Sequence, residues 1–366
     1  MLLISLLAVQ GQQAYRDSLK NLLTSTTNDT AKLICLSNLF YQYLYAYPDS
    51  AITYVQQEIL LARKSESDLA IANSYFDYGS FFEIIGDFPQ TLSYIQEGLK
   101  LVEKHKNWIM TARAYNDIGM VYFDEGDYDN ALSNCKKAKS IIEQKWNMHF
   151  EKDLYTAGDL TGDTIVNYNY IISGLSEIYE KKNQLDSALK YVQFLKDQTI
   201  QLNGKMDWSI IPYYFGNIYR KKNDYASALK YYRWGMELAE EQGVNIDIMK
   251  NGMGMAKTFK QMGEFDSSIF YANRVIQISQ VAYNPTIKLE ALNVLATIYK
   301  TQNKIDSVAK YLEFVIAIKD SLFGQNKNMQ LQSLRFEEQV RQQNQVRQQE
   351  ELQNSIKRLC CMNVCG

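Results

Sequence analysis

The chain is poor in residues that interrupt helices. Its 366 residues include 4 prolines and 18 glycines. Pro48, Pro89, Pro212 and Pro285 all fall near the beginning of a predicted helix, where the missing backbone N–H and the fixed φ angle of proline are tolerated. Because no proline lies inside an apolar pattern of helical spacing, the sequence permits uninterrupted helices along most of its length.

Neither sign of charge predominates. The chain has 39 Lys and Arg residues and 41 Asp and Glu residues, which leaves a net charge of -2 at pH 7. A surface that binds nucleic acid or an anionic membrane carries an excess of basic residues, so we expect neither partner. The apolar run Leu2–Val9 is also short, since a membrane-spanning helix needs about 20 apolar residues.

Residues suited to catalysis or metal binding are scarce. His105 and His149 are the only 2 histidines, and neither has a neighbouring Cys or a metal-ligand motif. Cys35 and Cys135 lie inside helical patterns, as small core residues do. Three further cysteines close the chain without a second pair of ligands, so a soft-metal site there is disfavoured and no disulfide framework is expected. We therefore predict a non-enzymatic protein with no catalytic residues, metal or cofactor.

The segment 112–142 shows how the chain is organised. Apolar and small residues recur in it at three- to four-residue spacing on both sides of Gly126-Asp127, which is typical of two antiparallel helices. Gly126 is expected to end the first helix, and Asp127 to accept hydrogen bonds at the start of the second. Gly119 and Ala131 have little or no side chain, so the two backbones can approach closely there.

This pattern returns at a fixed interval. The small residue early in the second helix recurs at steps of 40, 40, 57, 40, 40 and 40 residues, at Ala51, Thr91, Ala131, Ala188, Ala228, Ser268 and Val308. The order of aromatic, small residue, Tyr, Gly-Asp-Tyr and Ala resembles the tetratricopeptide repeat. The resemblance implies an all-α, right-handed solenoid of about seven helical hairpins, in which each hairpin packs on its neighbours.

Two sets of positions are predicted to hold the hairpins together. The small positions include Gly79, Gly119, Gly216, Ala51, Ala131, Ala188 and Ala228. A mid-helix aromatic accompanies them at Phe82, Tyr122, Tyr179, Tyr219, Phe259 and Tyr299.

The N-terminal residues 1–11 resemble a truncated signal peptide. The apolar run ends at a small-residue exit, although no basic residue precedes it. We therefore expect an exported, periplasmic or extracytoplasmic protein, with a cytoplasmic location as the alternative. Residues 12–324 are predicted to form the solenoid.

The single step of 57 residues places an insertion at about residues 147–163. Insertions in repeat arrays usually form a loop on one face, and such loops are often functional. A longer helix with an inert linker is an equally favoured interpretation.

Residues 325–366 differ in composition. Up to Arg358 this part is rich in Gln, Arg and Glu and lacks Pro and Gly, which favours one long helix. Its apolar residues are spaced too irregularly to define a heptad register. A weak coiled coil that forms a homodimer and a free helix therefore both remain open.

The tetratricopeptide resemblance implies that the first helix of each hairpin lines a groove for a peptide or protein partner. It places these residues toward the groove: Asn116, Tyr213, Asn217, Arg220, Lys257, Lys260 and Asn293. The cations among them suit an acidic group or a terminal carboxylate. Tyr213 and Gly254 depart from the family's carboxylate-binding pattern, and solvated charges on helix faces are the alternative.

Residues 319–343 look like the connector that leads from tetratricopeptide repeats to a membrane helix in bacterial sensor histidine kinases. The chain as a whole resembles the extracytoplasmic input region of such kinases without the kinase. We expect an input region of signal transduction whose continuation, including any membrane segment, is encoded downstream. A stand-alone soluble assembly scaffold is the second interpretation, and an all-helical enzyme the third.

Overall fold

The computed structural model describes residues 2–44, 47–146, 162–280, 282 and 284–364. These residues form 15 α-helices and no strand. None of the helices in the described ranges is long and apolar enough to cross a membrane. The predicted all-α class is therefore confirmed.

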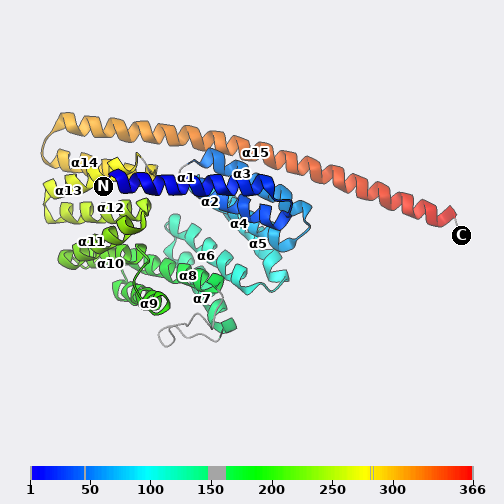
Figure 1. Ribbon diagram of the computed structural model, residues 1–366, viewed down its shortest axis with the longest axis horizontal. Coiled ribbons are helices and arrows are strands. Elements are labelled where there is room, and N and C mark those ends of the chain that lie inside the picture. The colour runs from blue at the N-terminus through cyan, green and yellow to red at the C-terminus, as the bar shows by residue number, and fades with distance from the viewer. Residues whose placement is uncertain (1, 45–46, 147–161, 281, 283, 365–366) are drawn as a thin grey trace. The chain divides into compact units, whose positions relative to one another are not determined.

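The helices alternate in two series that form seven hairpins (Figure 1). The first helices of the hairpins are α2 (Asp29–Leu44), α4 (Asp68–Ile84), α6 (Trp108–Asp124), α8 (Gly162–Lys181), α10 (Ile210–Lys221), α12 (Asn245–Met262) and α14 (Pro285–Thr301). The second helices are α3 (Pro48–Lys64), α5 (Phe88–Lys104), α7 (Tyr128–Trp146), α9 (Leu185–Asn203), α11 (Tyr225–Gln242), α13 (Phe265–Ile278) and α15 (Ile305–Val364). Helix α1 (Leu2–Ser25) precedes them and packs on α2.

The chain separates into two compact units, Met1–Lys319 and Asp320–Gly366. Helix α15 begins in the first unit and continues without interruption into the second. The boundary predicted between residues 324 and 325 therefore lies inside this helix and does not interrupt it. One glycine disfavours a helix by only about 1 kcal/mol, and the surrounding Gln, Asn, Lys and Leu residues continue the hydrogen-bonded ladder.

Two predicted segments lie partly outside the described residues. In the proposed insertion 147–163, only residues 162 and 163 are described, and they begin α8. The backbone of residues 2–11 is helical as part of α1, whereas the surroundings of their side chains are not described.

The turns inside the hairpins use a left-handed residue, as predicted for Gly126, whose φ is 83°. In other hairpins asparagine takes this position, with φ of 58° at Asn183 and 61° at Asn223. Asparagine tolerates the left-handed region better than most residues because its short side chain makes local hydrogen bonds. The Asp127 carboxylate then accepts a hydrogen bond from the N–H of Asn130 at 3.1 Å and caps the second helix.

The predicted small positions lie in the packed interior. Ala51, Ala131, Ala188 and Ala228 are each 0% exposed. A β-carbon at Gly119 would lie 2.5 Å from the Cys135 Sγ of the facing helix, so only glycine permits this approach.

A stacked aromatic pair is repeated in five of the hairpins. In each pair the predicted aromatic of the first helix lies face to face with a tyrosine of the second helix, with centroids 5.4 to 5.7 Å apart and interplanar angles of 6 to 14°. The pairs are Phe82–Tyr94, Tyr179–Tyr191, Tyr219–Tyr231, Phe259–Tyr271 and Tyr299–Tyr311. Each pair fixes one first helix against its own second helix.

Candidate functional site

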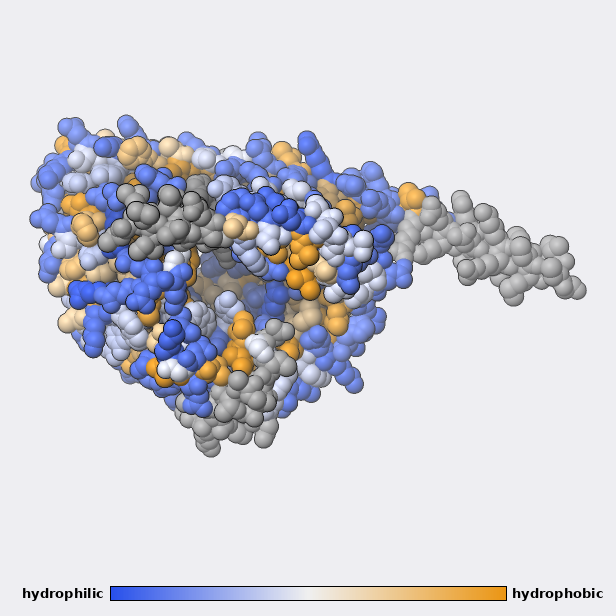
Figure 2. All heavy atoms as spheres, viewed as in Figure 1, coloured by the Kyte–Doolittle hydropathy of each residue, from blue (hydrophilic) through white to orange (hydrophobic). Residues whose placement is uncertain are grey.

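The first helices lie side by side along much of the array. Close approaches join α2 to α4, α6 to α8, α8 to α10, α10 to α12 and α12 to α14. We call the surface that they form together the first-helix face. Figure 2 shows a hollow in the viewed face of the molecule, bordered by both hydrophilic and hydrophobic residues. Polar side chains on the first-helix face are therefore candidates for ligand recognition.

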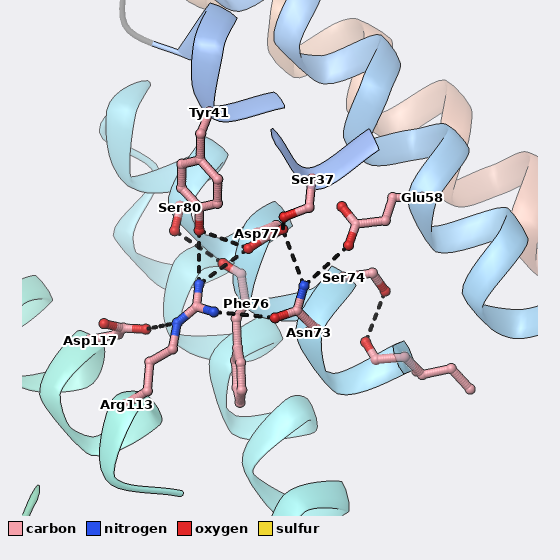
Figure 3. A network of polar contacts seen from close by, with 11 residues as sticks. Ser37, Tyr41, Glu58, Asn73, Ser74, Phe76, Asp77, Ser80, Arg113 and Asp117 are labelled. Carbon is pink, nitrogen blue, oxygen red and sulfur yellow. Dashed lines mark hydrogen bonds and ion pairs between the residues drawn. The ribbon is translucent and has the colours of Figure 1, made fainter. Parts of the chain in front are cut away.

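A buried polar network occupies this face in the first three hairpins (Figure 3). Its centre is Asp77 of α4, whose side chain is 0% exposed. The Asp77 carboxylate accepts hydrogen bonds from the Ser37 hydroxyl at 2.6 Å and the Tyr41 hydroxyl at 2.7 Å, both from α2. Asp77 thus connects the first helices of two hairpins.

Arg113 of α6 supplies the guanidinium of this network. Its Nη2 donates to the Tyr41 hydroxyl at 2.8 Å and to Asp77 at 3.2 Å, and its Nη1 donates to the Asn73 side-chain oxygen at 3.2 Å. Its Nε lies 3.6 Å from a carboxylate oxygen of Asp117. A planar guanidinium satisfies several acceptors at fixed angles, so Arg113 orders three hairpins together.

Glu58 extends the network to α3, which is the second helix of the first hairpin. Its side chain is 1% exposed, and its Oε1 accepts a hydrogen bond from the Asn73 amide at 3.3 Å. Its other oxygen, Oε2, is buried, and the Glu58 side chain also shares a hydrogen bond with the carboxyl group of Asp77. Burial, together with the negative charge of Asp77, raises the pKa of Glu58 well above its usual value.

Two further carboxyl groups of the same face, those of Glu83 and Asp117, also have raised pKa values. Burial raises the pKa of Glu83 to about 8, and the charges of Asp117 and Asp124 add to the effect. Burial also raises the pKa of Asp117 to about 6, although Arg113 opposes the shift. The first three hairpins therefore carry more buried carboxylates than Arg113 can neutralise.

The residues predicted to line the groove occur in several different settings. Asn116 is 8% exposed, and its side-chain oxygen lies 3.7 Å from the Cys135 sulfur, so it belongs to the packing of its own hairpin. Asn293 is exposed on α14. Tyr213 packs against the ring of Tyr232, and burial raises its pKa to about 12.

The predicted cations are partly engaged within the protein. Lys257 forms an ion pair with Glu290 of the next first helix. Arg220 Nη1 donates to the Gln261 side chain at 3.4 Å. Lys260 is half-buried and forms no ion pair within the described ranges. The three cations thus occur on adjacent first helices, α10 and α12, but their charges are not all available to a ligand.

Asn217 is held by the protein as well. Its side-chain oxygen accepts a hydrogen bond from the Tyr232 hydroxyl at 2.7 Å. Its amide orientation is therefore fixed by α11, a second helix that reaches toward the first-helix face.

The network around Asp77 was not anticipated from the sequence, although the repeat contains a signal for it. Ser37, Asp77 and Asp117 are successive members of one register of 40 residues, and Asn73 and Arg113 belong to another. Residues in one register lie on neighbouring first helices, so polar residues that recur there meet across hairpins. His105, by contrast, lies 2.8 Å from Asp68 at the surface. The described ranges contain no group of three or more His, Cys, Asp or Glu that could hold a metal ion.

Comparisons with known proteins agree with this architecture. The tetratricopeptide repeat family matches residues 112–145. No sequence among curated proteins matches the chain. The family match covers most of the hairpin of α6 and α7, and the other six hairpins have the same helix–turn–helix architecture.

Several solved structures have a similar fold. The quorum sensor NprR from B. thuringiensis, in its apo form, has a TM-score of 0.57 and 15% identity over 85% of this chain and 82% of that chain. NprR in complex with its cognate peptide NprX has a TM-score of 0.58 and 14% identity, with 86% of each chain covered. A Rap protein complexed with Competence and Sporulation Factor has a TM-score of 0.52 and 12% identity over 88% of this chain and 99% of that chain.

Proposed function

We propose that this protein is a non-enzymatic scaffold that binds a peptide or protein partner on its first-helix face. The observation that carries the proposal is the ordered array of ionic and amide side chains on successive first helices, centred on Asp77 and Arg113. The buried Asp77 holds this network in place, so its half-buried members Arg113 and Asp117 need not be ordered by an extended ligand. NprR, which has a similar fold, binds its cognate peptide NprX, and this supports a peptide as the partner.

The later hairpins supply the cationic part of this surface. Arg220, Lys257 and Lys260 lie on α10 and α12, and Lys257 already holds Glu290. An acidic ligand group would compete with Glu290 for Lys257 and add to the contacts of the other two cations. We therefore expect ligand binding there to weaken as salt is raised.

A peptide array probed with the purified protein tests the proposal. Peptides selected by the parent should bind the triple variant Arg220→Glu, Lys257→Glu, Lys260→Glu at least about tenfold more weakly when they carry acidic residues. The matched control Lys205→Glu, Lys230→Glu, Lys310→Glu makes the same charge change at exposed positions and should bind as the parent does. Equal affinity of both triple variants would exclude the cationic part of the first-helix face, and selection of no peptide at all would contradict the scaffold proposal.

A role as the input region of a signal-transduction sensor is the finer form of this proposal. It is supported by α15, a single helix that leaves the last hairpin and continues to Val364. A ligand that orders the hairpins would change the stability of the helix that begins among them. Hydrogen exchange in residues 320–346 should slow when a selected peptide binds, whereas unchanged exchange would favour the alternative of a stand-alone assembly scaffold.

Export and the lack of catalysis complete the proposal. Cleavage near Gly11 in an expressing cell, read by mass spectrometry of the mature N-terminus, would establish export, and an intact N-terminus on cytosolic protein would favour the cytoplasmic alternative. The purified protein should not phosphorylate itself with ATP, because its sequence contains no phosphate-binding loop or histidine-kinase motif.

A further inference from the structure

The inference concerns the side of α15 on which a further hairpin would stack. In each of the six earlier hairpins the second helix contacts the first helix of the next hairpin, as α11 contacts α12. In the seventh hairpin α15 is the second helix, and the stack of Tyr299 on Tyr311 holds it against α14. Because α15 then continues as a single helix to Val364, no first helix follows it in the described part of the chain.

This side of α15 is apolar and exposed where the earlier second helices are covered. Leu312 is 44% exposed, whereas Tyr232, at the same repeat position in the fifth hairpin, is 0% exposed and lies between α10 and α12. Ile316 is 57% exposed, whereas its counterpart Met236 is 6% exposed. The Met236 Cε lies 3.7 Å from the place of a β-carbon at Gly252, so α12 covers it. The side of α15 thus continues an interface that the array uses between its hairpins.

The exposed apolar residues of this side form one strip along the helix. Ile305, which is 78% exposed, belongs to it as well. Successive residues of an α-helix are rotated by about 100°, so Ile305, Leu312 and Ile316 lie within about 40° of one another around α15. We call these three residues the end strip. Their spacing of seven and four residues is typical of a helix that packs along a second helix.

The charged residues beside the end strip are separated by sign. Asp306, Glu313 and Asp320 are exposed along one edge of the strip, and Lys319 is exposed along the other edge. When two identical parallel helices face each other, the acidic edge of one lies against the basic edge of its partner. In an antiparallel pair each edge meets its own kind, which would place Asp306 against Asp320. The charges therefore favour a parallel pair of identical helices.

We propose that the end strip is an interface with a second copy of this chain, in which two parallel α15 helices pack about a twofold axis. The contact involves the last hairpin, so it is separate from the first-helix face and from a coiled coil of residues 325–366. A single pair of helix faces buries less than the about 1,200 Å² of a standard interface. The dimer should therefore be weak, with a Kd on the order of 10 µM.

Sedimentation equilibrium of the full chain measures the association. A reducing agent is present throughout, because Cys360, Cys361 and Cys365 could otherwise join two copies by disulfides. Between about 1 and 200 µM the protein should change from monomer to dimer. A monomer over the whole range would overturn the proposal and leave the end strip to a different protein. An open series of larger species would overturn it too, since a twofold contact closes at two copies.

A matched pair of variants locates the interface. Ile316→Ser should weaken the dimer by about tenfold or more, because the change removes an apolar contact from both copies. Phe314→Ser removes a side chain that is 46% exposed from the opposite side of the same helix, and it should dimerise as the parent does. Both residues are exposed, so both variants should keep the parent's circular dichroism. A dimer that Phe314→Ser weakens as much as Ile316→Ser would contradict the assignment.

A charge exchange tests the parallel arrangement, and it decides the matter should Ile316→Ser fail to fold. Lys319→Glu should weaken the dimer by about threefold or more, because the new carboxylate meets the acidic edge of the other copy. The double variant Lys319→Glu, Asp320→Lys reverses both edges and should recover the parent's Kd. Adjacent residues of a helix do not face each other, so this recovery reports a contact between copies. A stronger dimer in Lys319→Glu, or no recovery in the double variant, would overturn the parallel pairing.

Discussion

The ring of Tyr232 in α11 fills the space beside Gly254 in α12, where a β-carbon would overlap the Cε1 and Cζ atoms of the tyrosine. A β-carbon at Gly216 in α10 would meet the same ring. The ring therefore passes between two first helices, and its hydroxyl donates to Asn217 at 2.7 Å. This explains why glycine stands at position 254, where the family's carboxylate-binding pattern has a polar residue.

Gly254→Ala should destabilise the protein by about 1 to 3 kcal/mol, because the ring of Tyr232 must move away from both helices. Chemical denaturation measures the change. Gly324→Ala is the matched control, since no atom lies within 4 Å of the added carbon and alanine favours the helix. Equal stability of Gly254→Ala and the parent would show that the ring adapts without strain.

Ala228→Arg should lower the free energy of unfolding by about 3 to 5 kcal/mol, because position 228 is 0% exposed and the charge would be buried without a partner. The control Ala226→Arg places the same side chain on the exposed side of the same helix turn. Thermal melts followed by circular dichroism compare the two. Coincident melts would mean that the small residue at this repeat position does not govern packing.

Asn134→Tyr should stabilise the third hairpin by about 0.5 to 1.5 kcal/mol. Asn134 stands 12 residues after Tyr122, at the position where five other hairpins carry the second ring of a stacked pair. Ser133→Tyr adds the same ring at an exposed neighbouring position and serves as control. A gain of stability in both variants would point to helix propensity rather than stacking.

Arg113→Met should destabilise the protein by about 3 to 5 kcal/mol, because it leaves the fully buried carboxylate of Asp77 without its cation. The double variant Asp77→Asn, Arg113→Met removes both charges and should lose less than the sum of the single variants. A double-mutant cycle measures this coupling. Strict additivity would show that the ion pair contributes nothing beyond the neutral hydrogen bonds.

Glu83→Gln should stabilise the protein at pH 8.5 and have almost no effect at pH 4. The folded-state pKa of Glu83 is about 8, against an ordinary 4.5, so the folded protein holds this proton more tightly than the unfolded chain does. The parent's free energy of unfolding therefore falls as the pH rises from 4.5 to about 8, and it levels off at higher pH. Unfolding free energies at both pH values provide the test, with Glu237→Gln, which removes an exposed carboxylate, as the control.

The sequence was sufficient for the hairpins because the signal repeats in every unit. Ala131 and its counterparts except the half-buried Val308 occupy buried positions, and Gly126 adopts the left-handed turn. Only the first ring of each stacked pair was predicted from the sequence. Tyr219 was identified, while its partner Tyr231 was missed, although tyrosines recur at that register from Tyr191 to Tyr311.

The candidate site was less accessible to sequence reasoning. Helical periodicity indicates which residues share a face, but not that Lys257 finds Glu290 or that Asn116 turns into its own hairpin. These contacts depend on side-chain directions and on the separation of neighbouring first helices. Glu58 was not predicted for a related reason. It lies on α3, the second helix of its hairpin, and only first helices were expected to line the groove.

The stacked aromatic pairs have a consequence for how such a chain can change length. Both rings of a pair belong to one hairpin, so duplication or deletion of a complete unit of 40 residues carries each pair along intact. The bond between Ser37 and Asp77 joins different hairpins and would be broken by a unit inserted between them. Growth or loss of units therefore preserves the aromatic pairs but breaks polar contacts between particular neighbours, such as Ser37–Asp77 in the first hairpins and Lys257–Glu290 in the later ones.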